Sequence, residues 1–296
     1  PDIYAGDLLV ATDELFDALP SLARTVQRGY VTISNGHGAW EMALSNTLSK
    51  GQRVLVLECG RFAQVWGEMA SFNGLQVEMM VAAPGRAIDP ELVAERLAAD
   101  GERSFAAVLM AHVDTASSIR NDVPAIRRVL DELDHPALLM VDCIASLGCE
   151  AFEMDAWGVD VAVAGSQKGL MTPPGLSFVA ANRKALAAHA RAGLVTRYWD
   201  WTFRDGEEHY MKYCGTPPEH LTFAWRRAMD LLLEEGLDNV LERHRLLSRA
   251  VHAAVDVWRQ GGALDFNIEN PVERSAAVTS VLCPGCGPRA ILDFCR

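Results

Sequence analysis

Short apolar runs rich in β-branched residues alternate with longer stretches of helical pattern between residues 30 and 181. Most of the runs are continuous, which is typical of strands buried on both faces. The predicted strands are residues 30–34, 53–58, 76–81, 105–111, 137–142, 160–165 and 176–181, and the predicted helices are residues 39–49, 62–72, 90–99 and 124–133. This repetition predicts an α/β fold, a mostly parallel seven-stranded sheet with helices on both faces. The loop before the last run is too short for a crossover helix, which favours an antiparallel pair and a mixed sheet.

The pattern changes after residue 218. Long amphipathic helices are predicted at residues 219–233 and 237–260, followed by a strand at residues 276–282. We therefore expect a large domain over residues 1–218, and a linker helix with part of a small α+β domain over residues 219–296. Because the chain starts at Pro1 and stops at Arg296 inside a helical pattern, we expect both ends to be trimmed and targeting signals to be unreadable.

The charge balance restricts the kind of partner. The 296 residues carry a formal net charge of −12, which repels nucleic acid and anionic membranes, and no apolar run reaches the length of a membrane span. We expect small molecules and another copy of the chain as partners. The seven cysteines are scattered, which fits a reducing compartment and a cytoplasmic protein. Cys283 and Cys286 have C-x-x-C spacing without a second ligand pair, so we expect a turn with two free thiols and no metal site.

A segment of small and polar residues lies between the first predicted strand and the next helix. It reads Asn35-Gly36-His37-Gly38. Ligands of open α/β sheets bind at such carboxyl ends of strands, where glycines let the backbone approach an anion and the helix N-terminus attracts it. The segment predicts a phosphate site, although glycine turns also join strands to helices without binding anything. It lacks the patterns of the P-loop and of the dinucleotide-binding fingerprint, which argues against a nucleotide.

Two charged residues follow buried runs. Asp142 ends the apolar run of residues 137–142, where a carboxylate is costly to bury without a cation. A protonated pyridine nitrogen is one such cation, and a helix N-cap or a loop salt bridge is the alternative. Lys168 lies in the small-residue loop GSQKG at residues 165–169. That position suits imine formation, and the alternative is an ordinary surface lysine.

A polar cluster follows the predicted strand of residues 105–111. It reads AHVDTASS at residues 111–118. Either His112 or Thr115 is a candidate to contact a substituent of a bound ring. The alternative is a capping segment for the helix near Pro124.

Several strings resemble class V aminotransferases, and most closely their serine–glyoxylate and alanine–glyoxylate branch. They are residues 35–41 (NGHGAWE), 141–148 (VDCIASLG), 157–160 (WGVD), 165–168 (GSQK) and 234–239 (EEGLDN). They occur in the family's order over nearly the whole chain. The resemblance implies a fold-type-I enzyme that binds pyridoxal 5′-phosphate (PLP) and acts as a homodimer with a shared active site.

The resemblance also assigns roles to individual residues. Lys168 would carry PLP as a Schiff base and move the substrate proton, and Asp142 would pair with the pyridinium nitrogen; these are the two predicted catalytic residues. The remaining predicted cofactor contacts are the backbone of Asn35, Gly36 and His37 with the Gln167 side chain at the phosphate, Phe62 stacked on the ring, Thr115 at its polar edge, and Tyr213 and Thr216 reaching the phosphate of the partner subunit. The family's N-terminal P-G-P segment is absent here, and its arginine for the substrate carboxylate would lie beyond Arg296.

The implied activity is transfer of an amino group from serine, alanine or aspartate to glyoxylate or a similar 2-oxo acid. A cysteine desulfurase-like lyase also fits the resemblance, but such enzymes usually carry His before the PLP lysine, where this chain has Gln167. Transamination of an aminophosphonate or of pyridoxamine is compatible with the same strings, and so is a PLP-binding fragment without catalytic activity.

Overall fold

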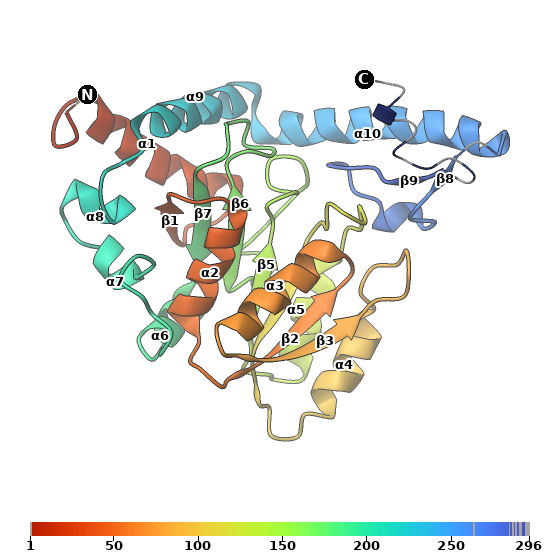
Figure 1. Ribbon diagram of the computed structural model, residues 1–296, viewed down its shortest axis with the longest axis horizontal. Coiled ribbons are helices and arrows are strands. Elements are labelled where there is room, and N and C mark those ends of the chain that lie inside the picture. The colour runs from red at the N-terminus through yellow and green to blue at the C-terminus, as the bar shows by residue number, and fades with distance from the viewer. Residues whose placement is uncertain are drawn as a thin grey trace.

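The computed structural model describes residues 2–262, 264–283, 285, 287, 289 and 292–293. Its centre is a seven-stranded sheet of order β1-β7-β6-β5-β4-β2-β3 (Figure 1). The strands are β1 (Arg28–Thr32), β2 (Arg53–Glu58), β3 (Gln76–Val81), β4 (Phe105–Ala111), β5 (Leu138–Asp142), β6 (Val161–Gly165) and β7 (Ser177–Ala181). Strand β7 is antiparallel to both of its neighbours, and the other pairs are parallel. The predicted α/β class, the mixed sheet and the antiparallel last pair are confirmed.

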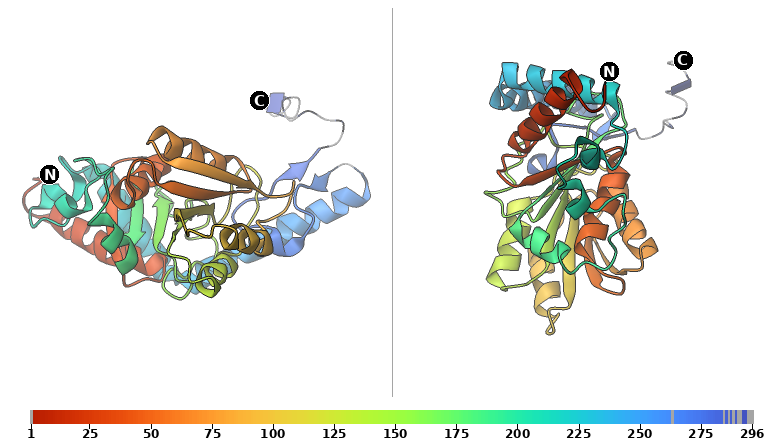
Figure 2. Two further views of the ribbon diagram at one scale, coloured as in Figure 1. Left: turned by 90° about the horizontal axis from the view of Figure 1, so that it is seen from below. Right: turned by 90° about the vertical axis from the view of Figure 1, so that its left-hand side faces the viewer.

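Helices cover both faces of the sheet (Figure 1, Figure 2). One face carries α2 (Gly36–Thr47), α3 (Arg61–Phe72) and α6 (Arg183–His189), and the other carries α1 (Asp7–Leu22), α4 (Pro90–Ala98), α5 (Val123–Glu132) and α9 (Glu219–Glu235). Successive strand residues point to opposite faces. In β4, Val108 and Met110 enter one buried cluster, while Ala107 and Leu109 enter the other. Burial on both faces is the physical reason for the continuous apolar runs.

Helix α1 lies in a segment for which we predict no element. Its buried residues include Leu8, Leu15, Leu19 and Leu22, and this spacing puts them on one helical face. That face packs against α9 and β1, so α1 covers this face of the sheet at its edge strand β1.

The C-terminal part contains α10 (Leu237–Gln260), which runs along the upper side of the molecule (Figure 1). The predicted helices at residues 219–233 and 237–260 are confirmed, while the domain division at residue 219 stays a prediction. Within the described ranges, none of the helices has the length and apolar character needed to cross a bilayer. The remaining elements are α7 (Trp201–Arg204), α8 (His209–Tyr213), η1 (Pro271–Glu273), β8 (Asp265–Phe266) and β9 (Val281–Leu282).

The predicted strand at residues 276–282 is wrong for most of its length. Only Val281–Leu282 pairs, with β8. Upstream, side chains take up the backbone N–H groups that a strand would use: the N–H of Ala276 donates to Glu150 and that of Ser280 donates to the Ser118 hydroxyl. Cys286 lies outside the described residues, so the expected turn with two free thiols stays a prediction.

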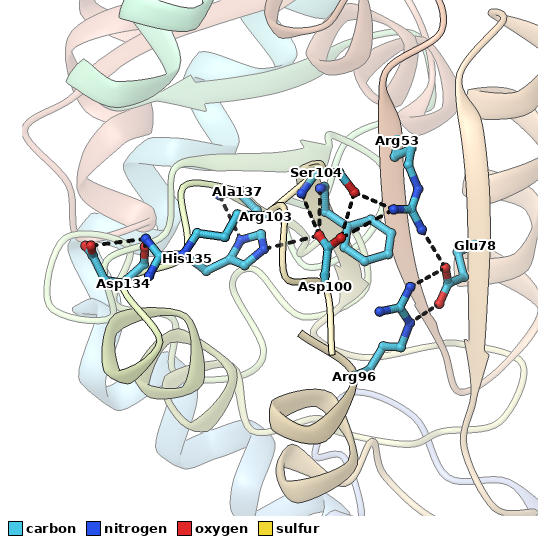
Figure 3. A network of polar contacts seen from close by, with 10 residues as sticks. Arg53, Glu78, Arg96, Asp100, Arg103, Ser104, Asp134, His135 and Ala137 are labelled. Carbon is cyan, nitrogen blue, oxygen red and sulfur yellow. Dashed lines mark hydrogen bonds and ion pairs between the residues drawn. The ribbon is translucent and has the colours of Figure 1, made fainter. Parts of the chain in front are cut away.

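A network of charged side chains lies at the amino ends of the strands (Figure 3). Its centre is Asp100, which is 8% exposed. Its carboxylate accepts hydrogen bonds from the backbone N–H groups of Ser104 and Phe105, at 2.6 and 3.2 Å, and from the Ser104 hydroxyl at 2.8 Å. Arg53 and His135 contact the same carboxylate at 3.5 and 3.7 Å. Burial alone would raise the pKa of Asp100, but these hydrogen bonds hold the pKa below its usual value.

The network extends sideways to the sheet edge through Glu78 of β3. Glu78 pairs with both Arg53 and Arg96 (Figure 3). Both guanidinium groups lie over the Phe105 ring, at 4.3 and 4.9 Å from its centroid, which adds a cation–π contribution. The network therefore ties β2, β3 and α4 together at the end of the sheet opposite to the strands' carboxyl ends.

Replacing Asp100 tests the contribution of this network. Asp100→Ala leaves the N–H groups of Ser104 and Phe105 without an acceptor and removes one of the two carboxylates beside Arg53, so we expect a loss of about 2–4 kcal/mol in the free energy of unfolding. Asp134→Asn is the control, because Asp134 pairs with Arg103 at the surface with its side chain 96% exposed and Asn tolerates the left-handed backbone of this residue; its loss should stay below about 0.5 kcal/mol. Urea denaturation measures both variants, and equal losses would contradict the assignment.

Candidate active site

A cavity of about 160 Å³ lies at the carboxyl ends of β4, β5 and β6, beside the N-termini of α2 and α3. Eight of the ten predicted site residues line it: Asn35, Gly36, His37, Phe62, Thr115, Asp142, Gln167 and Lys168. The lining also includes residues that the sequence analysis does not select, among them Trp40 and Ile144. The fold thus brings five separate segments together at one edge of the sheet: residues 35–40, 62, 113–115, 142–145 and 167–168.

The N-terminus of α2 forms one wall of the cavity. The side chain of Asn35 caps the helix by accepting the N–H of His37 at 3.1 Å, so the Gly36 N–H and the positive end of the helix remain for an anion. Gly36 is buried, and a Cβ at this position would collide with the side chain of Ile144. A side chain at residue 36 would have to displace Ile144, because α2 comes close to the segment after β5.

Asp142 ends β5 and is 4% exposed. Its Oδ1 accepts the N–H of Ile144 at 2.7 Å, and its Oδ2 accepts the indole N–H of Trp40 at 3.1 Å. Burial raises the pKa of Asp142 to about 7, against the lowering effect of these two hydrogen bonds, while Asp114 raises the pKa further and Lys168 lowers it. Both alternatives for Asp142 are wrong. Among the described residues it begins no helix, so it is not an N-cap, and it makes no ion pair, so it is not part of a loop salt bridge.

Lys168 lies in the loop between β6 and β7. The loop is held by hydrogen bonds across it, from the Ser166 N–H to Leu176, from the Ser166 hydroxyl to Pro173 and from the Thr172 hydroxyl to Ser166. The Lys168 side chain is exposed and lines the cavity, and its amine makes no ion pair or hydrogen bond within the described chain. A rigid loop therefore presents an uncommitted amine to the same cavity as Asp142.

Lysine is scarce in this chain. There are four, Lys50, Lys168, Lys184 and Lys212. Lys184 donates to the carbonyl of Ala137 at 2.7 Å and Lys212 pairs with an exposed aspartate. Lys168 is the lysine that lines the cavity, so the candidate for imine chemistry is unambiguous.

Asp114 holds the remaining wall together, although the sequence analysis does not select it. It is fully buried. Its Oδ2 accepts the N–H groups of Phe62 and Ala63 at 2.8 and 3.2 Å, at the start of α3, and its Oδ1 accepts the N–H of Ala116 at 2.9 Å. Gly60 accommodates it, since a Cβ there would lie 2.5 Å from the carboxylate. One carboxylate thus fixes the backbone of both Phe62 and the segment that contains Thr115.

The choice between His112 and Thr115 is decided by burial. Thr115 lines the cavity. His112 is 3% exposed, its Nδ1 contacts the Ser146 hydroxyl at 3.0 Å, and its ring packs against Trp157. Burial lowers the pKa of His112 to about 3, so it is a neutral core residue. The interpretation of this segment as a cap for the helix near Pro124 is wrong as stated, because Asp122 caps α5 and Asp114 caps α3.

Tyr213 and Thr216 are not brought to the cavity. Tyr213 is fully buried within its own chain, and its hydroxyl lies 3.1 Å from the Thr12 hydroxyl and 3.3 Å from that of Thr222. In this conformation the hydroxyl is not available to a partner's phosphate, so that interpretation needs correction. Thr216 is exposed, and its role across a subunit boundary stays a prediction.

A larger hollow of about 780 Å³ lies between α1 and β1. Arg28 pairs there with Asp205 and Lys212 with Asp13, and Arg204 donates to backbone carbonyls. It offers no free amine or nucleophile among the described residues, so the smaller cavity is the candidate active site. No group of three or more potential metal ligands occurs in the described part of the chain.

The cavity fits PLP on four independent observations. Asp142 is a buried carboxylate that would gain a cation from a pyridinium nitrogen. Lys168 provides the amine, and Gly36 with the α2 N-terminus provides an anion site. The fourth observation is Gln167, which lines the cavity and whose amide NH2 group makes no hydrogen bond within the described chain, so it can donate to a phosphate oxygen. A mixed sheet with this arrangement at its carboxyl edge defines a fold-type-I PLP-binding protein.

Comparisons with known proteins agree with this class. The family model described as "Aminotransferase class-V" matches residues 29–296. The chain is 39% identical to serine–glyoxylate aminotransferase of Methylorubrum extorquens over 256 residues, which are 85% of this chain and 63% of that protein. It is 40% identical to L-aspartate–glyoxylate aminotransferase of Paracoccus denitrificans over 239 residues, 80% and 60% of the two chains. The crystal structure of alanine–glyoxylate aminotransferase from Nostoc sp. matches with a TM-score of 0.85 and 26% identity, covering 96% of this chain and 74% of that one.

The chain belongs to the class V aminotransferase family. It spans about three fifths of the length of the two curated relatives named above.

Asp114→Asn tests the clamp between α3 and the segment of Thr115. An amide has one acceptor oxygen where Asp114 uses two, so at least one buried N–H loses its partner, and we expect a loss of about 1–3 kcal/mol in the free energy of unfolding together with weaker PLP binding. Asp89→Asn is the matched control, because Asp89 caps α4 with one oxygen and Asn caps equally well, within about 0.5 kcal/mol. Urea denaturation and a PLP titration measure the effects; equal behaviour of the two variants would refute the clamp.

The raised pKa of Asp142 predicts an unusual pH dependence of the PLP-free protein. The pKa is about 3.8 in the unfolded chain and about 7 in the fold, so its contribution to stability is present below pH 4 and is lost as the pH rises to 7. Asp142→Asn removes the ionisable group and therefore this loss of stability with rising pH. We expect the variant to be more stable than the parent by roughly 2–4 kcal/mol at pH 8, with a difference that shrinks towards pH 4. Urea denaturation at several pH values measures it, and a difference independent of pH would contradict the assigned pKa.

Proposed function

We propose that this chain forms the PLP-binding part of a transaminase that moves an amino group from serine, alanine or aspartate to glyoxylate or a similar 2-oxo acid. The observation that carries the proposal is that the free amine of Lys168 and the buried carboxylate of Asp142 line the same cavity. Family membership supports it. The choice of substrates rests on the relatives named for serine–glyoxylate and L-aspartate–glyoxylate transamination.

Each residue of the cavity has a defined task in this reaction. When bound, PLP supplies an electron-withdrawing ring that makes the Cα–H bond of an attached amino acid acidic. Lys168 would hold the cofactor through its Nζ, and the same amine, when free, would take the Cα proton and return it; positioned acid–base groups of this kind contribute about 10²–10⁴-fold in rate. Asp142 would accept the ring N–H. The Gly36 N–H and Gln167 would hold the phosphate, and Phe62 and Thr115 would hold the ring.

A lyase that uses a cysteine nucleophile is disfavoured by the state of the thiols. Cys59, Cys143 and Cys149 are buried, Cys214 and Cys283 are partly exposed, and none of these five described thiols lines the cavity. Burial raises the pKa of Cys59 to about 12 and that of Cys149 to about 11, so these thiols stay protonated and weakly nucleophilic.

A homodimer with shared active sites and a cytoplasmic location complete the proposal. The dimer rests on the family resemblance and on the exposure of Thr216. The location rests on the free cysteines of the described chain, which fit a reducing compartment.

Lys168→Ala tests the cofactor attachment. Incubation with PLP followed by borohydride reduction should add one phosphopyridoxyl group to the peptide that contains residue 168, as measured by mass spectrometry. The variant should lose this label by at least about tenfold, because the imine requires this amine. Lys184→Ala, a lysine outside the cavity, should keep it. Full labelling of the Lys168→Ala protein would refute the assignment.

The reaction itself is tested by glycine formation. The chain, not treated with borohydride, is mixed with PLP and glyoxylate and with serine, alanine or aspartate in turn. It should produce glycine with at least one of these donors, and Lys168→Ala should produce none above background. If the chain carries the label at residue 168 but forms no glycine with any donor, it is a PLP-binding protein without this activity.

A further inference from the structure

Trp40 contacts the carboxylate of Asp142 directly. It lies one helical turn after Gly36 in α2 and is 1% exposed. Its indole Nε1 donates to Asp142 Oδ2 at 3.1 Å, while the Ile144 N–H donates to the other oxygen. Each carboxylate oxygen thus has one donor, and Trp40 supplies the side-chain donor among the described residues.

Neighbouring rings fix the orientation of this indole. Trp66 of α3 stacks on Trp40 with ring centroids 5.8 Å apart and an interplanar angle of 15°. The His37 ring lies edge-on at 4.5 Å and 85°. Rotation of the Trp40 side chain would break both contacts in a close-packed interior, so the N–H points to Asp142 from a fixed direction.

We propose that Trp40 is a positioning residue: its indole N–H holds Asp142 ionised and aimed at the ring nitrogen of the cofactor. A carboxylate stabilises a protonated ring nitrogen by its charge, which a carboxylic acid lacks, yet burial of Asp142 favours the protonated form. Hydrogen bonds to a charged group are stronger than those to a neutral one, so the Trp40 N–H favours the ionised form. The part that concerns the cofactor rests on the proposed function; the hydrogen bond to Asp142 does not.

The other charged groups around Asp142 oppose one another. Asp114, from the segment after β4, disfavours its ionisation, and Lys168, from the loop after β6, favours it. The thiol of Cys143, next in the chain, is buried and its pKa lies well above its ordinary value, so it stays neutral. All three groups remain when Trp40 is replaced, so a change in the pKa of Asp142 can be assigned to the loss of the indole N–H.

Trp40→Phe removes the donor and keeps an aromatic ring. The matched control is Trp66→Phe, because Trp66 belongs to the same stack and its buried Nε1 has no hydrogen-bond partner in the described structure. In the PLP-free chain, the pH transition in urea midpoint that disappears in Asp142→Asn should move up by roughly one to two pH units in Trp40→Phe. It should not move in Trp66→Phe.

The cofactor-bound chain gives a second readout. With PLP labelled with ¹⁵N in the ring, the nitrogen chemical shift reports protonation, and its titration should move to lower pH in Trp40→Phe and stay in place in Trp66→Phe. If Trp40→Phe does not fold, benzothienylalanine at residue 40 replaces the indole N–H by sulfur at nearly constant shape. An unmoved transition in the PLP-free chain overturns the proposal. Failure of the parent to bind PLP overturns the proposed function and leaves the PLP-free experiment to decide the role of Trp40.

Discussion

The burial of one carboxylate is the constraint on which the rest of the site depends. Asp142 ends the strand β5, between β4 and β6, where both faces of the sheet are covered and water has little access. Two N–H groups hold its oxygens, and its pKa still rises to about 7. The buried carboxylate therefore destabilises the PLP-free fold, and a cation that binds in the cavity offsets this destabilisation. Specificity for a protonated ring nitrogen follows, because a neutral ligand of the same shape would leave the cost uncompensated.

The sheet topology places the amine opposite this carboxylate. β6 runs parallel to β5, so both strands end at the same edge of the sheet. β7 then returns antiparallel to β6, with Gly165 facing Ser177 in the register, which closes the Lys168 loop at its base. A crossover helix in place of this return would leave the loop open at one end. The antiparallel strand is therefore part of how the site is positioned.

Much of this arrangement could be predicted from the sequence, and the failures share one cause. Continuous apolar runs identified the buried strands, and the polar residue that follows each run identified most of the cavity. Trp40 and Asp114 were missed because their partners are distant in the chain: Asp142 follows Trp40 by 102 positions, and Phe62 precedes Asp114 by 52. Trp40 carried a usable signal, since it lies one helical turn after Gly36. The local pattern predicts a strand at residues 276–280 because it does not reveal side-chain acceptors such as Glu150. The resemblance places Tyr213 at a subunit boundary, whereas its hydroxyl lies between those of Thr12 and Thr222.

The scarcity of lysine has a chemical consequence of its own. Glyoxylate and PLP are aldehydes, and aldehydes condense with any accessible primary amine. Of the 27 basic residues, 4 are lysines and 23 are arginines, and guanidinium groups keep their protons near neutral pH. Besides Lys168, few side chains of this chain can form adducts, so the surface resists self-modification by the compounds that the cavity is proposed to handle.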